Sequence, residues 1–178
     1  MAELIMMCGI SGSGKSTIAM RYALTRSAII YSSDSIREEI YGDENCQKNP
    51  GRVFDILHQR VIKALSQGFD VVYDATNLSC KRRMNFLKTI AHIDCKKTCV
   101  VVVTTPEDIE ERMKYRDRKV PMEVVHRQMC QFQCPNYYEG WDKIVVSYNS
   151  KPEDCHTSYK KLGRECDIPH DNHHHSLS

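Results

Sequence analysis

The sequence contains no apolar run long enough to cross a membrane, and it carries little net charge. No stretch among its 178 residues approaches the roughly 18 consecutive apolar residues that a membrane-spanning helix needs. The formal charge of +2 is too small to indicate a nucleic-acid partner by itself. No basic stripe interleaved with aromatic residues marks a long nucleic-acid groove either. These absences argue against an integral membrane protein, and any anionic partner has to be argued from local clusters of charge.

Internal repeats and an interdomain linker are also missing, so the chain is expected to form one domain. Its length allows a full hydrophobic core, and a composition of 41% hydrophobic and 27% charged residues is ordinary for a globular protein. We predict a domain over residues 1–150 and a tail over residues 151–178, where apolar periodicity is lost. The histidines at 173–175 could be a tag remnant, a metal site or plain tail. We expect the tail to be poorly ordered or to lead to a further domain.

A disulfide framework is not expected, although the chain has nine cysteines. The number is odd, and Cys8, Cys99 and Cys130 lie in apolar stretches, where a free cysteine behaves as a small buried hydrophobe. The pairs Cys95/Cys99 and Cys130/Cys134 lack the two-residue spacing typical of zinc sites. The start of the chain does not resemble a signal peptide, because an apolar strand leads directly into a glycine-rich loop. We therefore expect reduced thiols and a cytoplasmic location.

Short apolar runs alternate with segments of helical periodicity along the first 150 residues. Apolar and β-branched runs predict strands at 4–10, 28–33, 69–76, 98–105 and 143–149. Helical spacing predicts helices up to about residue 25, from Ser35, and over 53–68, 80–93, 106–118 and 121–132. Strands separated by helices favour a parallel sheet that is covered on both faces. The expected fold is therefore α/β, a three-layer sandwich with a central parallel sheet.

The most informative stretch is GISGSGKST at residues 9–17, directly after the first predicted strand. Its spacing matches G-x-x-x-x-G-K-[ST], the phosphate-binding loop, and indicates a sandwich of the P-loop NTPase type, although a flexible glycine-rich turn is the alternative. Glycines let successive backbone N–H groups point at one anion, at the positive N-terminus of the next helix. Lys15 would reach the ATP phosphates, and the Ser16 hydroxyl would bind Mg²⁺. The expected phosphate-binding residues of this loop are Gly9, Ser11, Gly12, Ser13, Gly14, Lys15, Ser16 and Thr17.

Two charged side chains follow the second predicted strand, in the stretch SSDSIR. Ligands of open α/β sheets bind at the carboxyl ends of the strands, where this stretch lies. Ser35 and Glu38 match a capping box, which would begin a helix at Ser35 and leave Asp34 just outside it. From there Asp34 could accept a proton from an attacking hydroxyl, or it could be a simple helix cap. Arg37 could hold a phosphate of the acceptor, or it could pair with a helix carboxylate on the surface.

A further group of polar residues ends the third predicted strand, in the stretch VVYDATN. Asp74 terminates an apolar strand, so we expect it to point into the cleft near Mg²⁺ or its waters, with Ser16 as the other residue on the metal side. The alternative is a structural aspartate that bonds to nearby loop amides. By position alone, Thr76 and Asn77 are expected to lie close to the acceptor.

Basic side chains gather in the stretch RMKYRDRKVP, which follows a predicted helix and stops at Pro121. They are Arg112, Lys114, Arg116, Arg118 and Lys119. A charge run is usually a solvated face, but phosphoryl transfer needs positive charge over the moving phosphate, often from a mobile element. We therefore expect a helical lid here. A second group, Lys81, Arg82, Arg83 and Lys88, is either a modest basic patch or a solvated helix face.

These four stretches, in this order, resemble the polynucleotide 5′-hydroxyl kinase family of P-loop proteins, which includes the kinase domains of bacterial and bacteriophage end-healing enzymes. The resemblance covers roughly residues 3–149. The loop alone is shared by many proteins, whereas SDSIR and DATN together are much more specific. The resemblance implies transfer of the γ-phosphate of ATP, with Mg²⁺, to a 5′-hydroxyl end of DNA or RNA. The tail looks like the connector that joins some related kinases to an HD-type phosphohydrolase domain.

The resemblance also implies roles for individual residues. Asp34 would be the general base for the 5′-hydroxyl, and Arg37 would contact the phosphate of the acceptor nucleotide. Arg116 matches the lid arginine that contacts the ATP phosphates, with Arg112 as a helper nearby. The implied catalytic residues are Lys15, Asp34, Arg37 and Arg116.

Two other functions stay open at this stage. The same short kinase architecture occurs in proteins that phosphorylate small molecules such as sugars or nucleotide-sugars. A pure ATPase or a nucleotide-gated binding module would need only the loop and a water molecule. Asp34 favours a kinase over such a switch, which has no use for a hydroxyl-activating carboxylate. A nucleic-acid end presents both a hydroxyl for Asp34 and a phosphate for Arg37, but a sugar phosphate would present the same two groups.

Overall fold

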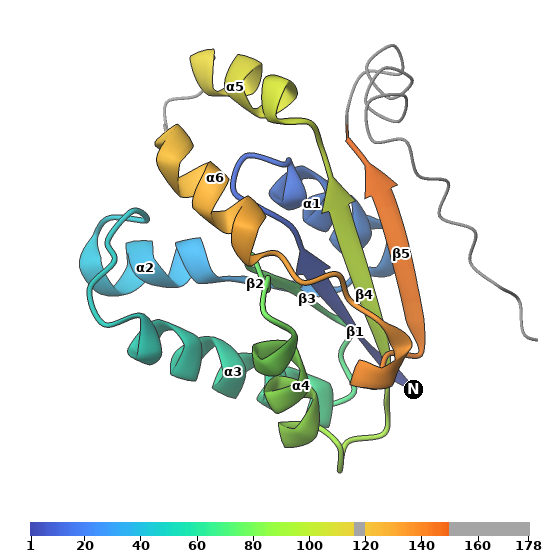
Figure 1. Cartoon of the computed structure of the whole chain (residues 1–178). Coiled ribbons are helices and arrows are strands. Elements are labelled where there is room, and N and C mark those ends of the chain that lie inside the picture. Colours follow the sequence, from blue (N-terminus) through green and yellow to red (C-terminus); the bar gives the residue numbers. More distant parts are fainter. Residues whose placement is uncertain (116–119, 150–178) are drawn as a thin grey trace, which may run out of the picture.

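Five parallel strands form a single sheet with the first strand at its centre (Figure 1). The computed structural model describes residues 1–115 and 120–149. The strands are β1 (Ala2–Cys8), β2 (Ile29–Ser32), β3 (Val71–Asp74), β4 (Cys95–Val103) and β5 (Lys143–Tyr148). They lie in the order β2-β3-β1-β4-β5, and every neighbouring pair is parallel. The parallel sheet predicted from the alternation of strands and helices is therefore confirmed.

Helices connect these strands. They are α1 (Lys15–Arg26), α2 (Ser33–Tyr41), α3 (Pro50–Ser66), α4 (Cys80–Thr89), α5 (Pro106–Lys114) and α6 (Met122–Gln131), with a short 3₁₀ helix, η1 (Tyr137–Glu139). Two predicted helix starts are confirmed: the Ser79 hydroxyl accepts a bond from the Arg82 N–H, and Pro106 lies in the first turn of α5. No helix within the described ranges is long and apolar enough to span a membrane.

Successive residues of β1 face two different hydrophobic cores. Ile5 and Met7 pack with Ile18 of α1 on one face of the sheet. Leu4 packs with Leu57 of α3 and with residues of α4 on the other face. Figure 1 shows α1 on the opposite side of the sheet from α3 and α4. The predicted three-layer sandwich is confirmed, and it explains why β1 is apolar at nearly every position.

Helices α5 and α6 lie over the carboxyl ends of the strands (Figure 1). Ile109 and Met113 of α5 form a third apolar cluster with Val125 of α6 and with Ile10, which follows β1. Of the stretch 112–121, where the lid is predicted, residues 112–114 lie at the end of α5. Residues 116–119, with Arg116, Arg118 and Lys119 among them, fall outside the described ranges, and so does the tail at 151–178. The roles predicted for them stay predictions.

Arg83, one of the residues of the predicted basic patch, lies in the interior. Its guanidinium is fully buried and makes two hydrogen bonds to the Glu139 carboxylate, of 2.6 and 2.8 Å. The same guanidinium donates to the carbonyls of Asn77, at 2.8 Å, and Leu78, at 3.0 Å. The surface interpretation is therefore wrong for Arg83, because the helical turn of α4 directs this position towards η1 and the loop after β3.

The Arg83–Glu139 pair is buried with nearly complete hydrogen bonding. The Trp141 indole N–H also donates to the Glu139 carboxylate, at 3.0 Å. Burial favours the neutral acid, but the hydrogen bonds from Arg83 and Trp141 hold the pKa of Glu139 below its usual value. The pair therefore connects α4, η1 and the loop after β3, and each buried charge is stabilised by the other.

The described cysteines are all free thiols. Cys8 and Cys99 are buried in adjacent strands, as predicted. Cys130 is exposed, so the prediction of burial is wrong there: among the residues of α6 only Val125 is fully buried, and Cys130 lies on the open side. No group of three His, Cys, Asp or Glu side chains within residues 1–115 and 120–149 could hold a metal ion.

Breaking the buried pair is expected to destabilise the fold strongly. Arg83→Met leaves the Glu139 carboxylate without its partner, and the free energy of unfolding should fall by about 3–5 kcal/mol in urea titrations. The double variant Arg83→Met/Glu139→Leu removes both charges and should lose less than the sum of the two single changes. Arg60→Met is the control, because its pair with Glu39 lies on the surface and its removal should change little. Equal effects for Arg83→Met and Arg60→Met would contradict this account.

Candidate active site

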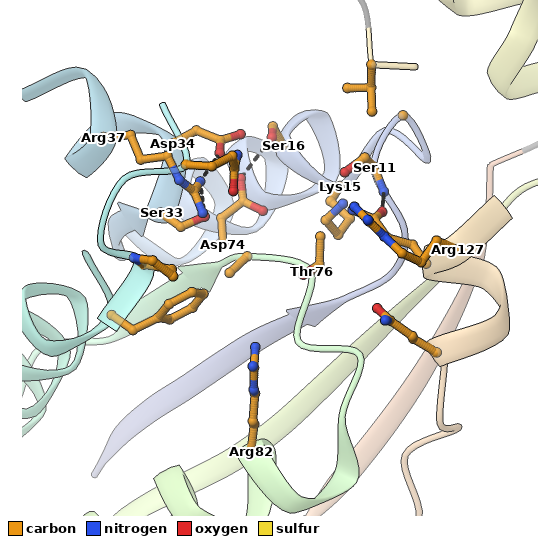
Figure 2. A pocket seen from close by; sticks show the side chains of 18 of the residues that line it. Ser11, Lys15, Ser16, Ser33, Asp34, Arg37, Asp74, Thr76, Arg82 and Arg127 are labelled. Carbon is orange, nitrogen blue, oxygen red and sulfur yellow. Dashed lines mark hydrogen bonds and ion pairs between the residues drawn. The ribbon is translucent and has the colours of Figure 1, made fainter. Parts of the chain in front are cut away.

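The loops after β1 and β3 and the start of α2 meet at the carboxyl edge of the sheet, around a cavity of about 500 Å³ (Figure 2). Predicted site residues from three separate stretches line it together. They are Ser11, Gly12, Gly14, Lys15, Ser16, Asp34, Arg37, Asp74 and Thr76. Among the described residues, the predicted ones that do not line the cavity are Gly9, Ser13, Thr17, Asn77 and Arg112, and Arg116 falls outside the described ranges.

The phosphate loop needs glycine at two positions. Gly12 and Gly14 have φ angles of +84° and +86°, in the left-handed region that side chains disfavour. A Cβ atom at Gly12 would lie 2.7 Å from Met113 Cε and 2.8 Å from Ile109 Cγ2. Gly14 caps α1 without a side-chain hydrogen bond, so the first N–H groups of this helix have no side-chain cap. This cradle fits a phosphate group, as the motif predicts.

Three side chains from other elements brace the loop. Asn149, which follows β5, donates from Nδ2 to the Ser13 carbonyl at 2.7 Å. Arg112 of α5 donates to the same carbonyl at 3.2 Å, and it also donates to the Asn149 carbonyl. Gln128 of α6 accepts a bond from the Ser11 N–H at 2.7 Å. Arg112 therefore bonds to the backbone of the loop, and its contact with the ATP phosphates stays a prediction. Asn149 and Gln128 belong to no predicted site.

Positive charge enters the cavity from several elements. Lys15 donates from Nζ to the Ile10 carbonyl at 2.8 Å, which holds its stem along the loop. Arg127 of α6 lines the same end of the cavity as Ser11 and Lys15 (Figure 2), and its guanidinium makes no hydrogen bond or ion pair with the described part of the chain. A cation so placed can contact a phosphate bound on the loop.

Asp74 lies beside the loop at the end of β3. The Ser16 hydroxyl donates to Asp74 Oδ2 at 2.8 Å. Burial raises the pKa of Asp74 above its usual value, although Lys15 and the Ser16 hydroxyl act in the opposite direction. The contact with Ser16 identifies its partner as a side chain rather than loop amides.

The Ser16–Asp74 contact fits Mg²⁺. A hydroxyl and a carboxylate are hard oxygen ligands, and Mg²⁺ usually takes one or two of these together with waters and substrate phosphates. Bound there beside the phosphate cradle, Mg²⁺ would neutralise charge on the phosphates. Ser16 and Asp74 are the residues that would hold the ion or its waters.

Helix α2 begins earlier than the capping box predicts. Its N-cap is Ser32, whose hydroxyl accepts a bond from the Asp34 N–H at 3.2 Å. The predicted box of Ser35 and Glu38 is therefore wrong, because β2 ends at Ser32 and the hydroxyl there caps the helix first. Asp34 lies in the first turn of α2, where the helix dipole favours a carboxylate.

Arg37 is buried beside Asp34 and is not a surface residue. Its Nη1 donates to Asp34 Oδ1 at 2.6 Å and to the Ser33 hydroxyl at 3.3 Å. The Asp34 side chain is 36% exposed, against 11% for Arg37. The carboxylate is thus open to the cavity, while the guanidinium is held behind it with nitrogen atoms to spare.

Thr76 and Asn77 have different surroundings. Thr76 lines the cavity, and its carbonyl accepts a bond from the Gly9 N–H at 3.0 Å. Asn77 adopts a φ of +47° and donates from Nδ2 to the Met7 carbonyl at 2.8 Å. This amide ties the loop after β3 to β1, and a contact between Asn77 and an acceptor stays a prediction.

Several residues that line the cavity belong to no predicted site. They are Ser33, Gln47, Pro50, Phe54, Ala75, Arg82, Val120, Arg127, Gln128 and Gln131. Arg82 belongs to the basic group predicted on α4, but the sequence pattern does not distinguish this cavity-lining arginine from the buried Arg83. The lining residues that come from α3 and α6 are single positions in segments of ordinary helical periodicity, so no local sequence motif identifies them.

Most of the chain matches a known protein family. The family model, described as an AAA domain, matches residues 4–135. The search of curated proteins found no match. The matched segment contains the phosphate loop, α2 and the loop after β3.

Solved structures share this fold. A gluconokinase from Sinorhizobium meliloti has a TM-score of 0.61 and 15% identity over 91% of this chain and 98% of its own. Kti12 from Chaetomium thermophilum, solved with ADP-AlF3, has a TM-score of 0.67 and 15% identity over 89% of this chain and 96% of its own. A chain of the Pnkp1/Rnl/Hen1 RNA repair complex has a TM-score of 0.64 and 22% identity, covering 73% of this chain but 43% of its own. At these identities the likeness establishes a shared fold of the P-loop type.

Asp74→Asn should separate stability from metal binding. A raised pKa means that the folded chain binds the Asp74 proton more readily than the unfolded chain, so the ionised carboxylate lowers stability as the pH rises. The variant should therefore melt higher than wild type at about pH 7.5, and this difference should shrink towards about pH 4. Mg²⁺ should add to the ATP-induced rise in Tm for wild type but not for Asp74→Asn. Asp55→Asn, at an exposed position of α3, is the control; an undiminished Mg²⁺ effect in Asp74→Asn would contradict the assignment.

Proposed function

Since the chain belongs to the AAA-domain family, we propose that it is a kinase that uses ATP and Mg²⁺ to phosphorylate the 5′-hydroxyl end of a DNA or RNA strand. One observation carries this proposal. A solvent-accessible carboxylate, Asp34, and a buried guanidinium, Arg37, share one cavity with the phosphate loop. A simple ATPase needs no such pair facing its nucleotide.

The ATP side of the site follows from the loop. Its backbone N–H groups and Lys15 would hold the phosphates, and Ser16 and Asp74 would hold Mg²⁺. Arg127 would add positive charge beside the γ-phosphate, where the transition state spreads negative charge over the equatorial oxygens. The resemblance gives this role to Arg116 as well, with Arg112 nearby, and both stay part of the proposal.

The transfer itself requires a base and an aligned hydroxyl. The acceptor oxygen attacks the γ-phosphorus while its proton passes to the Asp34 carboxylate. The bond between the γ-phosphorus and the bridging oxygen breaks, and ADP leaves with the electron pair. Arg37, bonded to Asp34 at 2.6 Å, orients the carboxylate and can hold the phosphate that follows the acceptor hydroxyl.

The choice of acceptor rests on these two groups together. A nucleic-acid end offers a hydroxyl and a neighbouring phosphate at one nucleotide's spacing. A neutral sugar offers no phosphate to Arg37, whose guanidinium would then contact Asp34 and Ser33 but no group of the acceptor. A small-molecule kinase is the second candidate, supported by the fold shared with the gluconokinase. The fold shared with a chain of an RNA repair complex supports the hypothesis of a polynucleotide kinase.

The cellular compartment of the enzyme is part of the same proposal. Free thiols on every described cysteine fit a reducing, cytoplasmic compartment. We further propose that residues 1–150 are the kinase domain.

An acceptor panel tests the proposed reaction. Labelled ATP is incubated with 5′-hydroxyl DNA and RNA oligonucleotides, a 3′-mononucleotide, gluconate, shikimate and nucleotide-sugars. We expect transfer to oligonucleotides at rates above those for every sugar, and loss of transfer by at least about a thousandfold in Lys15→Ala. Faster transfer to a sugar would support the small-molecule kinase, and phosphate release without any transfer would support the ATPase.

Arg37 and Arg127 are expected to act on different substrates. Arg37→Ala should mainly raise KM for the acceptor, because the acceptor phosphate is bound in the ground state and in the transition state alike. Arg127→Ala should instead lower kcat, by about a hundredfold, because its charge serves the transferring phosphoryl group. Arg21→Ala, on the exposed side of α1, is the control and should change neither constant. Exchanged effects would mean that the donor and acceptor sides are reversed.

A further inference from the structure

A second cavity, of about 830 Å³, adjoins the first. Residues of α3, α4, α6 and the loop after β3 line it. The residues that line both cavities are Pro50, Phe54, Thr76, Arg82, Gln128 and Gln131. A ligand that begins at Asp34 can therefore continue past this shared wall into the second cavity, which the transfer step itself does not use.

Aromatic rings from three elements form one wall of the second cavity, in which Tyr73 and Phe86 are 2% exposed and support the half-buried rings of Phe54 and His58. His58 of α3 lies over Phe86 of α4, with ring centroids 4.7 Å apart, and Tyr73 of β3 meets Phe86 edge-on at 5.2 Å. The Tyr73 hydroxyl is 3.0 Å from His58 Nε2. Burial lowers the pKa of His58 and raises that of Tyr73, so both rings are uncharged near neutral pH. Phe54 extends this wall into the first cavity.

Arg82 supplies the positive charge of the second cavity. Among the described residues that line it, Arg82 is the only Lys, Arg, Asp or Glu. Its guanidinium makes no hydrogen bond or ion pair with any other residue that the structure describes. Figure 2 shows the side chain rising from α4 into the space where the two cavities join. The second cavity thus offers one cation at its entrance and no carboxylate.

Uncommitted amides complete the lining. Asn85 of α4 and Gln131 of α6 are exposed, and neither side chain bonds to another residue in the described ranges. An amide can pair with the edge of a nucleobase while an aromatic ring stacks on its face. The combination of one cation, a flat uncharged wall and free amides matches a phosphate followed by a planar, uncharged ring.

We propose that this second cavity binds the second nucleotide of the acceptor strand, with its base against the aromatic wall and a backbone phosphate on Arg82. The assignment rests on the proposed function and adds to it a preference for acceptors longer than one nucleotide. A sugar or a mononucleotide acceptor has neither the second phosphate nor the second base. The single cation also limits the electrostatic footprint, so the salt dependence of binding should be shallow.

Acceptor length tests the assignment. For wild type, KM should fall by about tenfold from a 5′-hydroxyl 3′-mononucleotide to a trinucleotide. Arg82→Ala should raise KM for the trinucleotide by about tenfold, leave kcat and the mononucleotide KM unchanged, and reduce the slope of log affinity against log salt by about 0.7. Lys88→Ala, an exposed cation of the same helix that lines neither cavity, is the matched control.

A base-deleted acceptor tests the aromatic wall. A trinucleotide with an abasic second position should bind wild type about tenfold more weakly than the intact strand. Phe54→Leu, which keeps the apolar volume but removes the stacking face, should bind both strands alike, with melting curves confirming that it is folded.

The outcomes separate the two proposals. Transfer to oligonucleotides with no effect of Arg82→Ala or of the abasic position would overturn the second-nucleotide site and leave the kinase assignment intact. An equal loss for mononucleotide and trinucleotide would place Arg82 at the first phosphate and also overturn it. No transfer by wild type to any oligonucleotide would overturn the proposed function, and this site with it.

Discussion

The parallel pairing of β1 with β3 is the constraint on which the candidate site depends. Parallel strands end at the same edge of the sheet, so the register that sets Met6 beside Tyr73 brings the phosphate loop next to Asp74. The Ser16–Asp74 contact of 2.8 Å follows from that register. Two further bonds lock the loops together, from Asn77 to the Met7 carbonyl and from the Gly9 N–H to the Thr76 carbonyl. A slip of one residue in β3 would turn Asp74 to the other face.

Buried charge is arranged differently on the two sides of this edge. Arg83 and Glu139 satisfy each other behind the loop after β3, so the pair is structural and closed to ligands. Asp74 faces the cavity with only partial compensation, because burial raises its pKa despite Lys15 nearby. A carboxylate left in this condition is stabilised by an added cation, which is what a metal-binding position requires. The two hydrophobic cores on either face of β1 supply the stability that offsets this unfavourable burial.

The two cavities differ in chemistry along one continuous path. The first has cations from α1, α2 and α6 facing Asp34 and Asp74, which suits triphosphate chemistry. The second is lined by uncharged rings and amides, with Arg82 at the join. The lining thus changes from charged to aromatic along this path. A nucleotide changes in the same order, from a charged phosphate through a sugar to an aromatic base. Substrate choice would then depend on the wall of α3 and α4, which lies away from the reacting atoms.

The features of this protein that could be predicted from the sequence depend on residues that are close together in the chain. The alternation of strands and helices, the cap at Ser79, the proline in the first turn of α5 and the spacing of the phosphate loop all depend on neighbours in the chain, whose periodicity and dihedral preferences act locally. Tertiary structure decided the rest. It buried Arg83 against Glu139, 56 residues away, and it gathered three distant aromatic elements into one wall. Strand β2 ended at Ser32, so Asp34 entered the helix. These outcomes depend on register and packing between remote segments, which no local pattern encodes.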